Sequence, residues 1–136
     1  MPGAGISAAD LLRAYQVRRR LTRALSEMVF DRCDVLVTAC GQATAARWAD
    51  FGTDWPPPRL ANDMQTIPFS VSGHPALSVP IGFAGNGLPI GLQVAGRAFD
   101  EASVLRVAAA IEAELGQRHT RPPEPGAAPE EAGRTR

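Results

Sequence analysis

Two apolar runs joined by a short turn constrain the fold of this chain more than any other feature. The runs are ALSVPIGF at residues 76–83 and LPIGLQVA at residues 88–95, with Gly-Asn-Gly at residues 85–87 between them. Glycine and asparagine tolerate the positive φ angles of a tight turn, so the pattern predicts an antiparallel hairpin. Pro80 and Pro89 donate no backbone hydrogen bond, and they are therefore expected at strand ends or facing away from a neighbouring strand.

The second run also distinguishes the two faces of the predicted sheet. Successive side chains of a strand point to opposite faces, so Gly91, Gln93 and Ala95 share one face. The alternate residues are larger and apolar. Small residues on one face predict that another element packs closely against it.

Two amphipathic helices are predicted on either side of the hairpin in the sequence. The Ser-Ala-Ala-Asp sequence at residues 7–10 resembles a capping box, and apolar residues at helical spacing follow it over residues 8–30. Asp100 is a favourable N-cap for a second helix over residues 101–115, and Gly116 is suited to end it.

The remaining segments are less regular. DVLVT at residues 34–38 predicts a short strand buried on both faces. Residues 39–66 show little periodicity, and a loop of that length in a small domain is either functional or lies on protein that this chain does not contain. The end of the chain, residues 117–136, is rich in Pro, Glu and Arg and predicts a disordered tail. A single partial α/β domain is therefore expected over residues 1–116.

Composition excludes several classes of protein. The chain has 136 residues and zero formal net charge, no apolar run long enough to cross a bilayer, and no signal-peptide pattern, so the cytoplasm is the expected compartment. Cys33 and Cys40 are too few for a disulfide framework and are expected to be reduced. All 14 cationic side chains are arginine. A guanidinium is a poor proton acceptor, so lysine-based catalysis and P-loop chemistry are excluded for this sequence.

The predicted first helix carries a cluster of arginines. They lie opposite its apolar positions and are Arg13, Arg18, Arg19, Arg20 and Arg23. A nucleic-acid patch is one interpretation of this cluster. A solvated helix face is the interpretation that we favour, because the whole chain carries no net charge.

Residue patterns alone reveal no catalytic constellation. The candidate metal ligands Cys33, Cys40, His74 and His119 lack the close pairing of a zinc site, and no cofactor motif is present. The serines are scattered, and none lies in a Gly-x-Ser-x-Gly elbow. His74, between a glycine and a proline, is either a general base or a turn histidine satisfied by backbone groups, and we favour the second interpretation.

Several longer motifs of this sequence, taken together, resemble those of one enzyme family. TIPFSVSGHPALSVPIGF, followed by GLPIGLQVAGRAFDEASVLRVA, resembles the carboxy-terminal part of the amidase signature family. RAYQVRRRLTRAL and DVLVT are similar to the helix and strand that precede this block in the same enzymes. The match runs in order over residues 7–115. The resemblance implies the carboxy-terminal part of an amidase-type α/β/α mixed-sheet fold.

The resemblance also defines what this chain lacks. Enzymes of the family cleave carboxamides with a serine nucleophile, a second serine joined by a cis peptide bond, and a lysine. The hydroxyl must lose its proton to a positioned base as it attacks. This sequence has no lysine, no adjacent serines and no Gly/Ser-rich stretch. The resemblance therefore implies a segment that completes the sheet and lines part of the substrate cleft, without the catalytic set.

Two residues are candidates for substrate contact. DMQTIP contains Asp63 in the context where the glutamyl-tRNA amidotransferase A subunit has an aspartate that helps to recognise the amino group of glutamine. The other interpretation of Asp63, which we favour, is a loop carboxylate that caps a turn. His74 stands where the same protein tends to have leucine, so SGHPALS resembles a general amidase more closely. Ala39 and Cys40 follow Thr38 where the family often has Thr-Pro-Thr, so the loop path after this strand is open.

The sequence and the resemblance thus predict the carboxy-terminal portion of an amidase-type hydrolase that is inactive alone. A truncated, split or partially sequenced gene would encode such a chain. The expected partner is the amino-terminal catalytic part of an amidase or a second copy of the chain, with a small amide as substrate of the complete enzyme. Neither nucleic acid nor membrane is expected to bind. The alternatives are a non-catalytic accessory domain and the corresponding part of a glutamyl-tRNA amidotransferase A subunit.

Overall fold

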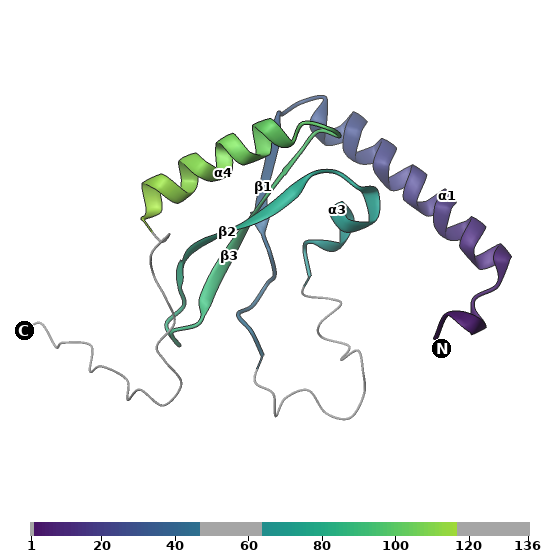
Figure 1. The fold of residues 1–136 in the computed structure, drawn as a ribbon, viewed down its shortest axis with the longest axis horizontal. Helices are drawn as coiled ribbons and strands as arrows, with labels where there is room; N and C mark the ends of the chain where they lie inside the picture. The colour runs from purple at the N-terminus through teal and green to yellow at the C-terminus, as the bar shows by residue number, and fades with distance from the viewer. Residues whose placement is uncertain (1, 47–63, 117–136) are drawn as a thin grey trace, which may run out of the picture.

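A computed structural model describes residues 2–46 and 64–116 of the chain. Two long helices, one short helix and a three-stranded sheet make up the described part (Figure 1). A short 3-10 turn, Pro2–Gly5, precedes the first long helix. The predicted tail at residues 117–136, most of the predicted loop, and Asp63 lie outside the described residues.

The first long helix begins where its capping box predicts. Helix α1 spans Ala8–Leu25, with the Ser7 hydroxyl accepting from the Asp10 backbone N–H and the Asp10 carboxylate accepting from the Ser7 backbone N–H. It continues directly into a π-helical turn, η2, over Ser26–Phe30. The helical path over residues 8–30 is therefore confirmed, with a change of hydrogen-bond pattern in its last five residues.

The sheet is antiparallel and has β3 at its centre. Strand β1 spans Val35–Ala39, β2 spans Ala76–Phe83 and β3 spans Pro89–Gly96, in the order β1-β3-β2. The predicted hairpin of β2 and β3 is confirmed. Of the residues in its turn, only Gly87 adopts a positive φ, and its N–H donates to Ala84. This matches a three-residue hairpin loop rather than a two-residue turn.

The prolines of the hairpin lie where they remove no needed donor. Pro89 begins β3, and Pro80 lies in β2, which is an edge strand of the described sheet, just before an irregularity of register at Gly82. Prolines are tolerated at such positions because the strand has a free side or a bulge there.

The prediction for β1 was wrong in one respect. DVLVT does form a strand, but β1 is an edge strand of the described sheet and all of its residues are half-buried or exposed. A short apolar run is equally consistent with a central strand or with an edge strand whose covering protein is elsewhere, so the sequence alone could not distinguish these.

The two faces of the sheet are covered by different helices. Helix α4, Glu101–Leu115, packs on β2 and β3, where a buried cluster consists of Val79, Val94, Val104 and Ala108. On the other face, a second cluster joins the π turn to the short helix α3, Ile67–Ser72, and consists of Phe30, Phe69 and Ala95. The α4, sheet and α1/α3 layers give the predicted α/β/α arrangement. No sequence signal had predicted α3.

Candidate functional site

His74, the predicted site residue that the structure describes, lies in the short connection between α3 and β2. Helix α3 ends at Gly73, whose φ of 82° is readily adopted by glycine. The His74 ring stacks on Phe30 with centroids 5.0 Å apart, and its side chain is almost completely buried. The stacking joins the start of β2 to the π turn that follows α1.

The hydrogen-bond contacts of His74 fit a neutral ring that is protonated at Nδ1. Its Nδ1 lies 2.9 Å from the Ser72 hydroxyl oxygen, and that hydroxyl lies 3.4 Å from the carbonyl of Phe69. A hydroxyl has one proton, so if Ser72 donates it to Phe69, Nδ1 carries the ring hydrogen and Nε2 is a bare acceptor. Within the described residues, the buried Nε2 has no hydrogen-bond partner. Burial lowers the pKa of His74, which favours the neutral ring.

This arrangement differs from both interpretations made from the sequence. The ring is not satisfied by backbone groups, because its one hydrogen bond is to the Ser72 side chain. Nor does a hydroxyl nucleophile approach Nε2 among the described residues. Nε2 can therefore make one hydrogen bond with a group that this part of the chain does not supply, and it accepts that bond when Nδ1 carries the ring hydrogen.

A polar sheet face lies on the same side of the sheet as α3. It crosses all three strands and consists of Thr38, Cys40, Ser78 and Gln93. The Thr38 hydroxyl donates to Gln93 Oε1 at 3.3 Å, and the Cys40 thiol lies 3.2 Å from the Ser78 hydroxyl. Gln93 is buried, whereas Ser78 is exposed. The face therefore presents neutral donors and acceptors.

Close packing on this face explains its small residues. A Cβ added to Gly91 would lie 3.0 Å from Cys40 Sγ, and Ala95 packs against Phe30 and Phe69. The prediction that another element approaches the face of Gly91, Gln93 and Ala95 is confirmed. The alternation of β3 was the signal for this face. Its partner residues in the neighbouring strands could be found only from the register.

The polar sheet face can orient a ligand but holds no obvious base. Its hydroxyl, thiol and carboxamide groups suit hydrogen bonds to a neutral polar group such as another carboxamide. Met64, the residue after Asp63, pairs with Gly41, and the Gln65 N–H donates to the Cys40 carbonyl. The described chain therefore resumes beside this face. Across the described ranges 2–46 and 64–116, no three potential metal ligands gather at one point.

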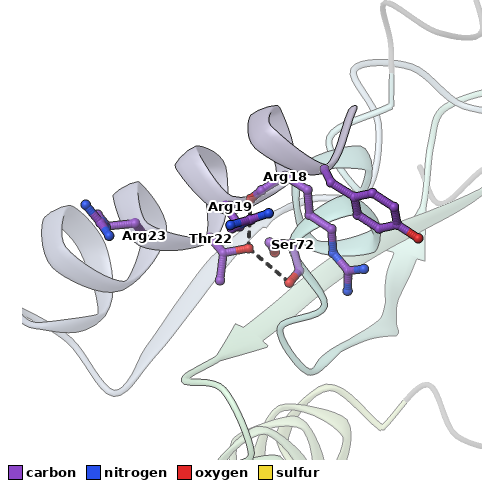
Figure 2. A pocket seen from close by; sticks show the side chains of 6 residues that line it. Arg18, Arg19, Thr22, Arg23 and Ser72 are labelled. Atoms are coloured by element: carbon purple, nitrogen blue, oxygen red, sulfur yellow. Dashed lines mark hydrogen bonds between the residues drawn. The ribbon is translucent and has the colours of Figure 1, made fainter. Parts of the chain in front are cut away.

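A second concave surface, the arginine groove, lies between α1 and the end of α3 (Figure 2). It has a volume of about 490 Å³ and is lined by Tyr15, Arg18, Arg19, Thr22, Arg23 and Ser72. The Thr22 hydroxyl bridges the two helices through the carbonyl of Arg18, at 2.9 Å, and that of Ser72, at 3.2 Å. The residues of α1 in the groove are spaced three or four apart, so they share one helix face.

No helix of the described part is long and apolar enough to span a bilayer. Cys33 and Cys40 are both free thiols.

Comparisons with known proteins agree with this architecture. The sequence profile of the family described as Amidase matches residues 2–105. The chain is 41% identical over 127 residues to the fatty acid amide hydrolase of Medicago truncatula, covering 85% of this chain and 20% of that protein. It is 42% identical over 104 residues to the A subunit of the glutamyl-tRNA(Gln) amidotransferase of Brevibacillus brevis, covering 76% and 21%.

Solved structures give the same result. The crystal structure of the A subunit of the glutamyl-tRNA(Gln) amidotransferase of Thermotoga maritima superposes with a TM-score of 0.65 at 38% identity, covering 76% of this chain and 22% of that one. A crystal structure of an amidase gives a TM-score of 0.71 at 28% identity, covering 85% and 27%. The chain thus spans about a fifth of the length of these curated relatives.

Proposed function

The chain belongs to the amidase family, and we propose that it supplies the carboxy-terminal part of an amidase-type hydrolase that acts on carboxamide C–N bonds. The observation that carries the proposal is the family match over residues 2–105 in a sequence that contains no lysine. Hydrolysis of an amide needs a positioned base for the attacking hydroxyl and donors for the developing oxyanion. In this proposal those groups come from the remaining part of the domain.

The role of this chain is to complete the sheet and to form one wall of the substrate cleft. The polar sheet face supports this role because its neutral groups are suited to a carboxamide and because Ser78 is exposed. Asp63 is our candidate for recognition of a substrate amino group. His74 is our candidate for a contact through Nε2, which lacks a partner in the described residues.

Two substrate classes are open for the complete enzyme. The similarity to fatty acid amide hydrolase favours a general amidase, and SGHPALS with its histidine favours the same choice. The similarity to the A subunit of the amidotransferase, together with DMQTIP, favours glutamine as the ammonia donor. The two choices differ in whether a carboxylate must face a substrate ammonium group.

A chimeric enzyme tests the proposal directly. In this chimera, residues 2–116 of the chain replace the matching segment of the Thermotoga maritima protein, which is 38% identical. We expect ammonia release from glutamine or from simple aryl and aliphatic amides, while this chain alone and the relative with its segment deleted both remain inactive. Turnover by the repurified chain alone that is lost in Ser78→Ala would contradict the proposal, as would a folded but inactive chimera.

The same chimera separates the two substrate classes. If Asp63 faces the amino group of glutamine, Asp63→Asn raises KM for glutamine and leaves simple amides unaffected. Equal effects on both substrates, or no effect, would favour a general amidase. Asp50→Asn is a matched control, because it removes one carboxylate in the same segment of the sequence.

A further inference from the structure

One face of α1 is left uncovered by the rest of the described chain. None of the 18 residues of this helix is buried. Leu11 and Tyr15 are about half exposed, at 51% and 49%. Their spacing of four places them on one side of the helix, and we call this line of residues the stripe. The stripe continues through Arg18 and Arg19 into the arginine groove, so the prediction that these two arginines lie opposite the apolar positions was wrong. Near its C-terminal end the helix meets α3, where the Thr22 hydroxyl donates to the Ser72 carbonyl.

The charges on this stripe are unbalanced. Arg13 pairs with Asp10 and Arg23 with Glu27, but Arg18 and Arg19 form no ion pair within residues 2–46 and 64–116. One guanidinium nitrogen of Arg18 lies 3.2 Å from the position that a Cβ on Gly73 would occupy. The Arg18 side chain therefore lies against the end of α3.

The geometry limits what can cover this face. Any partner that buries Leu11 and Tyr15 also covers Arg18, because all three lie along one stripe of the helix. Removing a guanidinium from water without a counter-charge costs several kcal/mol, so the partner needs acidic groups at this position. Arginine binds carboxylates through two parallel hydrogen bonds, which favours this pairing.

We propose that this stripe and the arginine groove form the interface with an acidic, amphipathic segment of the remaining part of the amidase domain. The inference rests on the proposed function and names the surface through which the two parts join. Apolar atoms of the segment pack on Leu11 and Tyr15, and its carboxylates bind Arg18 and Arg19. The relatives are about five times longer than the matched part, so protein to cover the helix exists in them. The zero net charge of this chain favours such a local contact over a nucleic acid or an anionic membrane surface.

Charge reversal in a two-part complex tests the interface. The full chain is co-expressed with the Thermotoga maritima relative from which the matching segment has been deleted, and the Kd of the purified pair is measured at two salt concentrations. We expect Arg18→Glu/Arg19→Glu to weaken the complex by about tenfold or more at low salt and less at high salt. Arg20→Glu is the matched control, since it makes the same charge change on α1 outside the groove and is expected to change Kd less than about twofold.

A conservative pair of substitutions separates charge from folding. Arg18→Lys/Arg19→Lys keeps both charges and should retain most of the affinity, with circular dichroism unchanged in all variants. The inference is overturned if the Lys and Glu variants lose affinity equally, if Arg20→Glu weakens the complex as much as the groove variants, or if the wild-type chain forms no complex. It is also overturned if the same arginines instead bind phosphatidylserine vesicles or single-stranded DNA more tightly than the deleted relative.

The covalent chimera distinguishes failure of this inference from failure of the proposed function. An active chimera with Arg18→Glu/Arg19→Glu as stable as Arg20→Glu rejects the interface and leaves the function in place. A complex whose Kd depends on Arg18 and Arg19 but that has no amidase activity supports the interface and rejects the proposed function.

Discussion

Helices α1 and α4 are both well capped, yet only α4 contains buried residues. Helix α4 begins with the Asp100 carboxylate accepting from the Ser103 N–H and ends at Gly116 in the left-handed conformation, and it buries Val104 and Ala108. Helix α1 is three residues longer and has a complete capping box, but none of its residues is buried. Its far end projects away from the strands (Figure 1).

This difference shows that local signals and packing are specified separately. Caps and spacing determine where a helix starts, but most of the stability of a protein helix comes from burial of its apolar face. For α4 that burial is supplied within the described chain by β2 and β3. For α1 the apolar and cationic stripe has to be covered by other protein, as the proposed interface requires.

The largest expected change in stability comes from placing an aspartate on the apolar side of each helix in turn. Val104→Asp places a charge among Val79, Val94 and Ala108, and it should destabilise the chain by about 4 kcal/mol or more. Leu11→Asp in α1 should change the stability of the isolated chain by less than about 0.5 kcal/mol, because Leu11 is half exposed and belongs to neither buried cluster. Urea unfolding followed by circular dichroism measures both effects.

In the covalent chimera the comparison changes. If the Leu11 stripe is covered there, Leu11→Asp should destabilise the chimera by clearly more than it destabilises the isolated chain. Equal, small effects in both proteins would mean that α1 stays exposed even in a complete domain.

The contact between β3 and α4 gives a smaller effect. A Cβ added to Gly96 would overlap Val104 Cγ2, so Gly96→Ala forces the helix away from the strand and should cost about 1–3 kcal/mol. Adding Val104→Ala should recover part of that loss. Gly85→Ala is the control, because its added Cβ meets no atom within 4 Å. Equal costs at Gly85 and Gly96 would exclude a steric origin.

The elements with strong local chemistry could be predicted from the sequence. The hairpin followed from two apolar runs around a glycine-rich turn, and both long helices followed from caps and spacing. Helix α3 could not be predicted, because Ile67–Ser72 is too short to show a helical period and contains Pro68. The edge position of β1 depends on which strands surround it, and its own five residues do not carry that information.

The candidate site could be predicted only in part. His74 was a candidate because of its place between Gly73 and Pro75, but its contacts with Phe30 and Ser72 depend on how three elements pack. Gln93 was noted only as part of an alternation. Its neighbours Thr38 and Ser78 are 55 and 15 residues away in the sequence, so only the strand register brings them together.

Removing the N-cap of α1 or of α4 should cost about 1 kcal/mol in each case, but the loss should appear in different measurements. Asp100→Ala and Ser7→Ala each remove a side-chain acceptor from a helix N-terminus, at a typical cost of about 1 kcal/mol. For α4 the loss should appear in the global free energy of unfolding, because the helix is part of the core. For α1 it should appear mainly as faster amide exchange in residues 8–12, because the first turns are unsupported. Protection factors and urea midpoints together test this, and a global loss from Ser7→Ala would show that α1 is as well packed as α4.

The smallest expected effect comes from His74, whose buried ring stacks on Phe30 just before β2 begins. Burial lowers the pKa of its ring from the usual 6.5. Below about pH 6.5, the ring therefore binds a proton in the unfolded chain but not in the folded chain. Stability should therefore be complete above pH 6.5 and fall as the pH drops from there to the folded pKa. The pKa values of Asp10 and Asp100 are also lowered, by hydrogen bonds from Ser7 and Ser103, but their contributions are lost only below the usual carboxylate range, near pH 3.8. His74→Gln keeps a polar side chain of similar reach, and it should remove the loss of stability that begins below pH 6.5. The loss that the two carboxylates cause below pH 3.8 should stay unchanged. A pH profile that is the same in the wild type and in His74→Gln would mean that the ring is not buried as a neutral group.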